Sequence, residues 1–252
     1  LFLASEVPPG TGLGSSSAMA VALVSALAAY TGQTFTPTGA AELACSLEIE
    51  RLRMPIGKQD QYASAIGGLN IFEFRGEGVQ VRPLALPADV VSSLSARLLL
   101  FASGQTRNSA DILGRINMEK QSKALEALHR IKALAGEMCT VLRSGDLDQF
   151  GHLLDVAWHE KKRMSGGIST RVIDQWYDAA RQAGALGGKV TGAGGGGFLL
   201  FYCPQERQDA LRKTLAQFGL EEMPFNFDFV GPQLSTRSWS SGFSMPLTLP
   251  RD

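Results

Sequence analysis

A glycine- and serine-rich stretch, PPGTGLGSSSA at residues 8–18, constrains the fold of this chain more than any other feature. Glycine loses more backbone entropy on folding than any other residue, so this stretch would be a costly connector. The apolar run that follows predicts a helix in the protein interior, with Ser15 or Ser16 near its start and Gly32 beyond its end. We therefore expect a ligand to lie against the glycine backbone at the start of this helix.

The N-terminus of a helix indicates what kind of ligand this is. Its first amide groups have no partner within the helix, and the helix dipole favours negative charge there. The amides of Ser15 to Ser17 would therefore suit a phosphate group, and serine hydroxyls are hard oxygen ligands of the kind that Mg²⁺ takes. The stretch is no Walker phosphate loop, because no Gly-Lys-Ser/Thr closes it. A glycine turn capped by serine is the alternative, and the residues alone leave both open.

A second glycine stretch lies far along the chain, in KVTGAGGGGFLLFYC at residues 189–203. Gly192, Gly194 and Gly197 have the G-x-G-x-x-G spacing of a dinucleotide-binding loop. That interpretation fails because a strand follows this loop, whereas a dinucleotide fold places a helix there. Four consecutive glycines also exceed what a tight hairpin requires. The stretch therefore predicts a surface that a neighbouring segment or a ligand approaches closely.

The order of the other elements indicates α+β architecture in two parts. The first part ends in a hairpin formed by LNIFEF and VQVRPL, and residues 84–95 form the boundary. The expected elements are helices at 36–53, 57–65, 108–142, 146–164, 169–183 and 204–218, and strands at 97–103, 187–190, 198–203 and 223–230. We expect a first domain at 1–90, a second at 91–230 and a loose tail at 231–252.

Composition narrows the class of protein. The charges sum to a formal zero, which argues against nucleic acid or an anionic membrane as the main partner. The longest apolar run, residues 18–30, is too short to span a membrane. The cysteines are odd in number and far apart, which favours reduced packing residues of a cytoplasmic protein over disulfides or a zinc site. They are Cys45, Cys139 and Cys203. Homo-oligomer formation stays open.

The two glycine stretches together resemble the second and third motifs of the GHMP kinases, the family of galactokinase and of homoserine, mevalonate and phosphomevalonate kinases. The resemblance extends over nearly the whole chain. The segments GKQDQYASAIGGLN, SGQTRNSADIL and VAWHEKKRMSGGIS look most like the branch that phosphorylates D-glycero-D-manno-heptose 7-phosphate at its anomeric hydroxyl.

This resemblance implies a two-domain GHMP kinase fold, with a ferredoxin-like α/β sandwich as its C-terminal domain, and an ATP-dependent sugar kinase. Galactokinase-like or fucokinase-like specificity is the nearest alternative. A ligand-binding descendant of the fold without turnover is the alternative from another class.

The resemblance also implies which residues hold the cofactors. ATP phosphates would lie against Pro9, Gly10, Gly12, Leu13, Gly14, Ser15, Ser16, Ser17, Gly192, Gly194 and Gly195. Mg²⁺ would be held by Ser16 and by a glutamate of the LEIER segment. We favour Glu50 for this role because it lies seven and three residues after Leu43 and Leu47, a stripe that would bury its carboxylate and require a cation. A surface position for Glu50, and Glu48 as the ligand, are the alternatives.

Asp60 occupies the position of the family's catalytic aspartate and would accept the proton of the sugar hydroxyl. Lys58 would keep Asp60 ionised and shield developing charge. An aspartate in the first turn of a short helix is the structural alternative. The remaining expected substrate contacts are Gln59, Gln61, Gly68, Gly194 and Arg107. Arg107 and the Lys161–Arg163 run are candidates for binding the sugar's own phosphate.

The first motif of the family, which belongs to an early strand, is absent from this sequence. A chain that truly began at Leu1 would lack the first strands of its N-terminal domain and part of the sugar pocket, and would leave a sheet edge unpaired. We expect weak or no activity from such a chain. The kinase interpretation stands if these residues belong to a longer chain.

Overall fold

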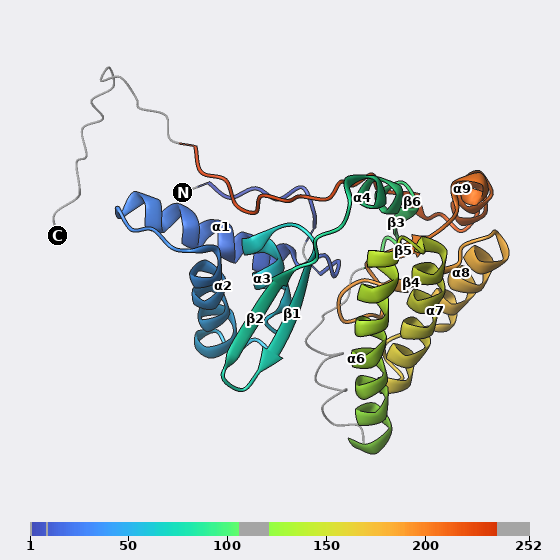
Figure 1. Ribbon diagram of the computed structural model, residues 1–252, viewed down its shortest axis with the longest axis horizontal. Coiled ribbons are helices and arrows are strands. Elements are labelled where there is room, and N and C mark those ends of the chain that lie inside the picture. Colours follow the sequence, from blue (N-terminus) through green and yellow to red (C-terminus); the bar gives the residue numbers. More distant parts are fainter. Residues whose placement is uncertain (1, 9, 106–120, 236–252) are drawn as a thin grey trace, which may run out of the picture.

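The computed structural model describes residues 2–8, 10–105 and 121–235 (Figure 1). Helices and a two-stranded sheet make up the N-terminal part, and a four-stranded sheet with long helices makes up the C-terminal part. This confirms the α+β prediction. The domain boundaries at residues 90 and 230 stay a prediction.

The N-terminal part is built from short elements that begin and end where the sequence indicates. The Thr36 side chain accepts a hydrogen bond from the Gly39 amide and caps the second helix, and Gly67, at φ +68°, ends α3. Its elements are α1 (Ser15–Tyr30), α2 (Pro37–Cys45), a π-helix (Ser46–Arg51), α3 (Gln59–Ile66), β1 (Asn70–Arg75) and β2 (Gly78–Pro83).

One side of α1 is exposed, so the prediction that it lies wholly in the interior is wrong. Val21 and Val24 are buried, whereas Leu27 is 49% and Tyr30 is 87% exposed. The helix is apolar or small at nearly every position, so its sequence does not mark which face packs. The packed face meets α2 and α3 through Ala41, Ala44 and Tyr62.

The C-terminal part is an antiparallel sheet in the order β4-β5-β3-β6. The strands are β3 (Leu98–Ala102), β4 (Gly187–Val190), β5 (Phe198–Tyr202) and β6 (Glu221–Glu222). The helices are α4 (Ala88–Ser95), α6 (Gln121–Ser144), α7 (Leu147–Met164), α8 (Arg171–Gln182), a 3₁₀ turn (Gln205–Arg207) and α9 (Gln208–Ala216). None of the helices within the described ranges is long and apolar enough to cross a membrane.

The two faces of this sheet pack differently. Leu199 and Phe201 belong to a core cluster with residues of α8 and α9. Tyr202 belongs to a cluster with residues of α6 and α7, and Leu69 and Ile71 of the N-terminal part pack against that cluster. The second face therefore lies toward the N-terminal part.

Two expectations for the connecting segments are wrong. Residues 84–95, expected to be an irregular boundary, contain α4, whose Leu94 is buried. Residues 223–230, expected to be a strand, form no strand, and only β6 precedes them. Pro224 has no amide hydrogen for a strand ladder.

Residues 223–231 instead connect the two parts, as the red trace in Figure 1 shows. The Met223 amide donates to the Leu100 carbonyl of the sheet, and the Gly68 amide donates to the Asp228 carbonyl at 2.6 Å. A Cβ on Gly67 would lie 2.6 Å from the Gly231 nitrogen, so this close contact requires glycine.

Candidate active site

The first glycine stretch leaves the start of α1 open to a ligand. Gly10, Gly12 and Gly14 have φ values of +78°, +78° and +70°, a region that glycine enters without strain. Gly14 is the N-cap of α1, and no side chain caps this helix. The first-turn amides are therefore available to an anion.

The two glycine stretches contact each other. A Cβ on Gly12 would lie 2.8 Å from the Thr191 carbonyl oxygen, and one on Gly197 would lie 2.1 Å from the Thr11 carbonyl oxygen. The Thr191 hydroxyl donates to the Thr11 carbonyl at 3.3 Å. The close approach predicted for the second stretch is confirmed, and the neighbouring segment is the first stretch.

The next glycines of the second stretch contact a different segment. The Gly195 amide donates to the Ile168 carbonyl at 2.9 Å, and a Cβ on Gly194 would lie 2.6 Å from that same oxygen. The turn between α7 and α8 thus supports the far side of this loop.

Asp60 lies directly against the first glycine stretch. A Cβ on Gly14 would be 3.1 Å from Asp60 Cγ and 3.4 Å from its Oδ2. The Asp60 side chain is exposed, yet desolvation by the surrounding protein raises its pKa, and the Glu48 charge raises it further. The Lys189 charge acts in the opposite direction and lowers it. Asp60 is thus a carboxylate next to the predicted phosphate site.

Glu48, rather than Glu50, faces Ser16. Glu48 is 4% exposed and accepts hydrogen bonds from Ser16 Oγ at 2.5 Å and from Gln61 Nε2 at 2.6 Å. Glu50 is exposed and accepts a hydrogen bond from the Ser46 hydroxyl at 2.8 Å. The burial predicted for Glu50 is therefore wrong, and the alternative Glu48 takes its place beside Ser16.

The error has a physical cause in the packing of α2. The buried face of α2 consists of three alanines and Cys45, because small side chains let α2 approach α1 and α3, whereas Leu43 and Leu47 stay 37% and 42% exposed. The chain also turns through a π-helix here, with the Leu52 amide donating to the Leu47 carbonyl five residues back. Counting residues as in an α-helix therefore fails across Ser46–Arg51.

The side chains around Glu48 fit a magnesium ion. Mg²⁺ prefers oxygen ligands and is usually held by one or two carboxylates together with substrate phosphates. Glu48 and Ser16 supply such oxygens, and the buried Gln61 Oε1 has no hydrogen-bond partner among the described residues. Those residues contain no group of three or more His, Cys, Asp or Glu that would hold a metal without phosphate.

Two lysines from the C-terminal part lie at this site. Lys161 Nζ donates to the Gly192 carbonyl at 2.6 Å and to the Val190 carbonyl at 3.4 Å. Desolvation, followed by the Lys189 charge, lowers the pKa of Lys161 to about 7. The pKa of Lys189 is also lowered by desolvation, and the Asp60 charge offsets only part of this effect. The sequence offered no signal for Lys189 beyond its position three residues before Gly192, the first glycine of the second stretch.

The other predicted cations lie elsewhere. Lys58 is exposed, and the lysine charge that opposes the raised pKa of the Asp60 carboxyl comes from Lys189. The catalytic role expected of Lys58 stays a prediction. Lys162 pairs with Asp174 at 3.0 Å, and Arg163 pairs with Glu160 at 2.7 Å. Of the Lys161–Arg163 run, only Lys161 reaches the glycine loops.

The predicted substrate contacts are spread over the site. Gln59 is exposed in the first turn of α3. Gln61 is fully buried and donates to Glu48, and its expected contact with the sugar stays a prediction. Gly68 lies next to Phe229, and a Cβ on Gly68 would be 3.3 Å from that ring. Pro9 and Arg107 lie outside the described residues.

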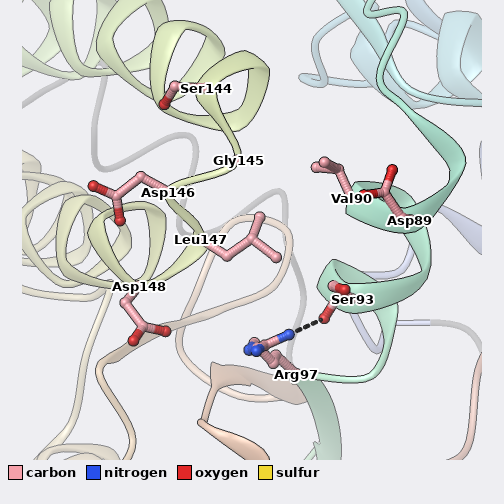
Figure 2. Close-up of a pocket in the computed structure, with 9 residues that line it drawn as sticks. All are labelled: Asp89, Val90, Ser93, Arg97, Ser144, Gly145, Asp146, Leu147 and Asp148. Atoms are coloured by element: carbon pink, nitrogen blue, oxygen red, sulfur yellow. Dashed lines mark hydrogen bonds between the residues drawn. The ribbon is translucent and has the colours of Figure 1, made fainter.

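A hollow of about 500 Å³ lies apart from the glycine loops, between α4 and the turn from α6 to α7 (Figure 2). Its polar side chains have structural partners: Arg97 donates to the Ser93 carbonyl, Asp146 caps α7 by accepting from the Gln149 amide, and Asp148 accepts from the Tyr202 hydroxyl. These contacts account for three of its polar side chains, those of Arg97, Asp146 and Asp148.

A helix N-terminus lined by glycine, with a carboxylate beside it and a second glycine loop against it, is an arrangement that suits a phosphate group. Comparison with known families agrees. The GHMP kinases N terminal domain matches residues 1–68, and the GHMP kinases C terminal domain matches residues 140–220. The chain belongs to the GHMP kinase family, as its sequence motifs predicted.

Several members of the family are similar over most of the chain. D-glycero-alpha-D-manno-heptose 7-phosphate kinase of Campylobacter jejuni is 34% identical over 93% of this chain and 69% of its own length. Mevalonate kinase of Methanothermobacter thermautotrophicus is 30% identical over 79% of this chain and 62% of its own.

A solved structure agrees with this. A D-glycero-D-manno-heptose 1-phosphate kinase of Bacteroides thetaiotaomicron matches with a TM-score of 0.72 at 30% identity, covering 90% of this chain and 64% of its own. The chain thus spans roughly two thirds of the length of these relatives.

Proposed function

We propose that this chain forms the nucleotide-binding and catalytic region of an ATP-dependent sugar kinase. Its reaction would transfer the terminal phosphoryl group of ATP to the anomeric hydroxyl of D-glycero-D-manno-heptose 7-phosphate, giving the 1,7-bisphosphate. The observation that carries this proposal is the meeting of both glycine stretches beside Asp60, with Gly14 against its carboxylate. A small-molecule sugar phosphate as partner and a cytoplasmic location belong to the same proposal.

Each group has a role that follows from its position. The amides at the start of α1 and the bare backbone around Gly12 and Gly192 would hold the nucleotide phosphates. Asp60 would accept the proton of the sugar hydroxyl as that oxygen attacks, and its raised pKa makes it a stronger base than an ordinary aspartate. Ser16 and Glu48 would hold Mg²⁺, which supplies neutralising charge to the phosphates.

The choice of sugar rests on the relatives. The Campylobacter protein that covers most of this chain is named for heptose 7-phosphate, and the Bacteroides structure is named for heptose 1-phosphate. We take the 7-phosphate because that relative has the higher identity. Relatives named for mevalonate and fucose are less similar, at 28 to 31% identity over smaller shares of the chain.

A coupled assay of ADP release, run over heptose 7-phosphate, heptose 1-phosphate, galactose, fucose and mevalonate, tests the proposal. We expect turnover with heptose 7-phosphate. Turnover only with another acceptor would move the substrate to a different branch, and nucleotide binding without turnover on any acceptor would favour a ligand-binding protein.

Asp60→Asn is the variant that tests the mechanism. It should reduce turnover by about 10²–10⁴-fold, the usual contribution of a general base, with little change in nucleotide affinity. Asp89→Asn, at the hollow of Figure 2, is the matched control and should leave turnover unchanged. Equal turnover in the wild type and Asp60→Asn would remove Asp60 from the mechanism.

A further inference from the structure

Two lysines converge where α7 and β4 meet the second glycine stretch. Lys161 comes from α7 and is held by the carbonyls of Gly192 and Val190. Lys189 comes from β4, two residues before Thr191, whose hydroxyl contacts the first glycine stretch. The Lys161 ammonium group thus lies against the second loop, and the Lys189 charge acts on it.

Strand register places Lys189 on the sheet face that looks toward Asp60. Lys189 pairs with Leu200 and Gly187 pairs with Tyr202, and directly paired residues of an antiparallel sheet share a face. Tyr202 packs in the cluster that includes contacts from the N-terminal part, where Asp60 lies. The mutual effects of Lys189 and Asp60 on their pKa values agree with this placement.

The two lysines repel each other. The Lys189 charge contributes to lowering the pKa of Lys161, and desolvation affects both groups. Lys161 is bound to neutral carbonyls, so within the described residues Asp60 is the carboxylate whose charge acts on this pair. Two like charges held close together with partial desolvation are costly unless an anion lies between them.

We propose that Lys161 and Lys189 together bind the terminal phosphate of a nucleoside triphosphate and hold it beside Asp60. This inference rests on the proposed kinase function and adds two residues to it. The terminal phosphate is favoured over the phosphate of a sugar because the lysines adjoin both glycine stretches. The far-end phosphate of a heptose accepting at its anomeric oxygen would lie away from Asp60.

Isothermal titration with Mg²⁺-adenylyl imidodiphosphate and with Mg²⁺-ADP tests this inference on the whole chain without any turnover. The wild type should bind the triphosphate analogue more tightly than ADP. Lys161→Met and Lys189→Met should each weaken binding of the analogue by about tenfold or more, as expected for a lost charge-assisted hydrogen bond, and should change ADP affinity by less than about twofold. The matched control is Lys162→Met, whose lysine pairs with Asp174, and it should change neither affinity.

Two results would overturn the inference: unchanged analogue affinity in both variants, or equal losses for the analogue and ADP. The Lys→Gln variants keep a polar side chain without the charge and decide the question if the Met variants do not fold. Selective loss of analogue binding, with no phosphorylation of any sugar by the wild type, would support this inference and contradict the proposed function.

Discussion

The site shifts the pKa values of Asp60 and Lys161 in opposite directions, and each shift favours the neutral form of the side chain. Desolvation raises the pKa of the Asp60 carboxyl, and it lowers the pKa of the Lys161 ammonium to about 7. Both shifts disfavour charge in the absence of ligand. A bound phosphate would reverse the shift of Lys161, because its negative charge favours the ammonium form.

Lys161 should therefore make stability depend on pH. Its pKa in the folded protein is about 7, below the ordinary value of 10.5, so the unfolded chain binds more protons between these two values. The contribution of Lys161 to stability should rise as the pH rises from 7 to 10. Thermal unfolding of the wild type and Lys161→Met at several pH values measures this. The wild type should gain stability relative to the variant across that range, and a constant difference would contradict the shift.

Comparing variants of Glu48 and Glu50 tests which of the two glutamates binds Mg²⁺. Glu48→Gln should raise the Mg²⁺ concentration needed for half-maximal binding of adenylyl imidodiphosphate by about tenfold, because a neutral amide is a weaker ligand than a carboxylate. Glu50→Gln, at an exposed position bonded to Ser46, should have no such effect. The same Mg²⁺ dependence in both variants would exclude Glu48 as the ligand.

At the residue scale, sequence reasoning found the groups that have a motif and missed those that depend on packing. Ser16 follows the glycines of the first stretch, and Asp60 lies between two glutamines. The structure brings both residues to one site. Burial was predicted for Glu50 instead of Glu48, because the leucine spacing suggested a buried stripe whereas α2 packs through alanines. Lys189 reaches Asp60 only through tertiary contact between two parts of the chain.

At the element scale, the two stretches require glycine because they contact each other closely, more than because they need a flexible backbone. Gly12 and Gly32 have almost the same φ, +78° and +71°, but a Cβ on Gly12 would lie 2.8 Å from the Thr191 carbonyl, while one on Gly32 would meet nothing within 4 Å. Gly32 is therefore a control for Gly12, because a side chain at Gly32 would add only the strain of a positive φ.

Gly12→Ala should destabilise the protein by about 1–3 kcal/mol, and Gly32→Ala by about 1 kcal/mol, because only the first adds a backbone clash to the strain. Gly12→Ala should also weaken nucleotide binding, which Gly32→Ala should leave intact. Urea unfolding and isothermal titration measure the two effects. Equal losses of stability and unchanged binding would show that the two stretches do not form one surface.

Helices and strands could be predicted where a capping residue or a regular spacing of apolar residues shows their limits. The helix expected to begin at residue 36, which Thr36 caps, and the hairpin of β1 and β2 are confirmed by the structure. The helix α4 was missed because it is only eight residues long and two prolines, Pro83 and Pro87, lie just before it. The segment from Met223 to Val230 has the alternation of a strand but forms none. Pro224 has no amide hydrogen to donate, and the Asp228 carbonyl accepts from the Gly68 amide of the N-terminal part instead.

At the scale of the whole molecule, two parts of the chain are joined at the glycine loops and along residues 223–231. The first contact places Thr11 against Thr191, and the second places Gly68 against Asp228. Neither follows from the period or composition of a segment, because each requires the folded positions of both parts. Resemblance to the GHMP kinases supplied what local patterns could not.

The central claim is that both glycine stretches surround one phosphate site beside Asp60, and a crystal structure with Mg²⁺-adenylyl imidodiphosphate tests it most directly. We predict that the phosphates contact the amides at the start of α1, with the second stretch against them and the terminal phosphate within hydrogen-bond reach of Lys189. Phosphates that touch only one of the stretches, or that lie away from Asp60, would contradict this account.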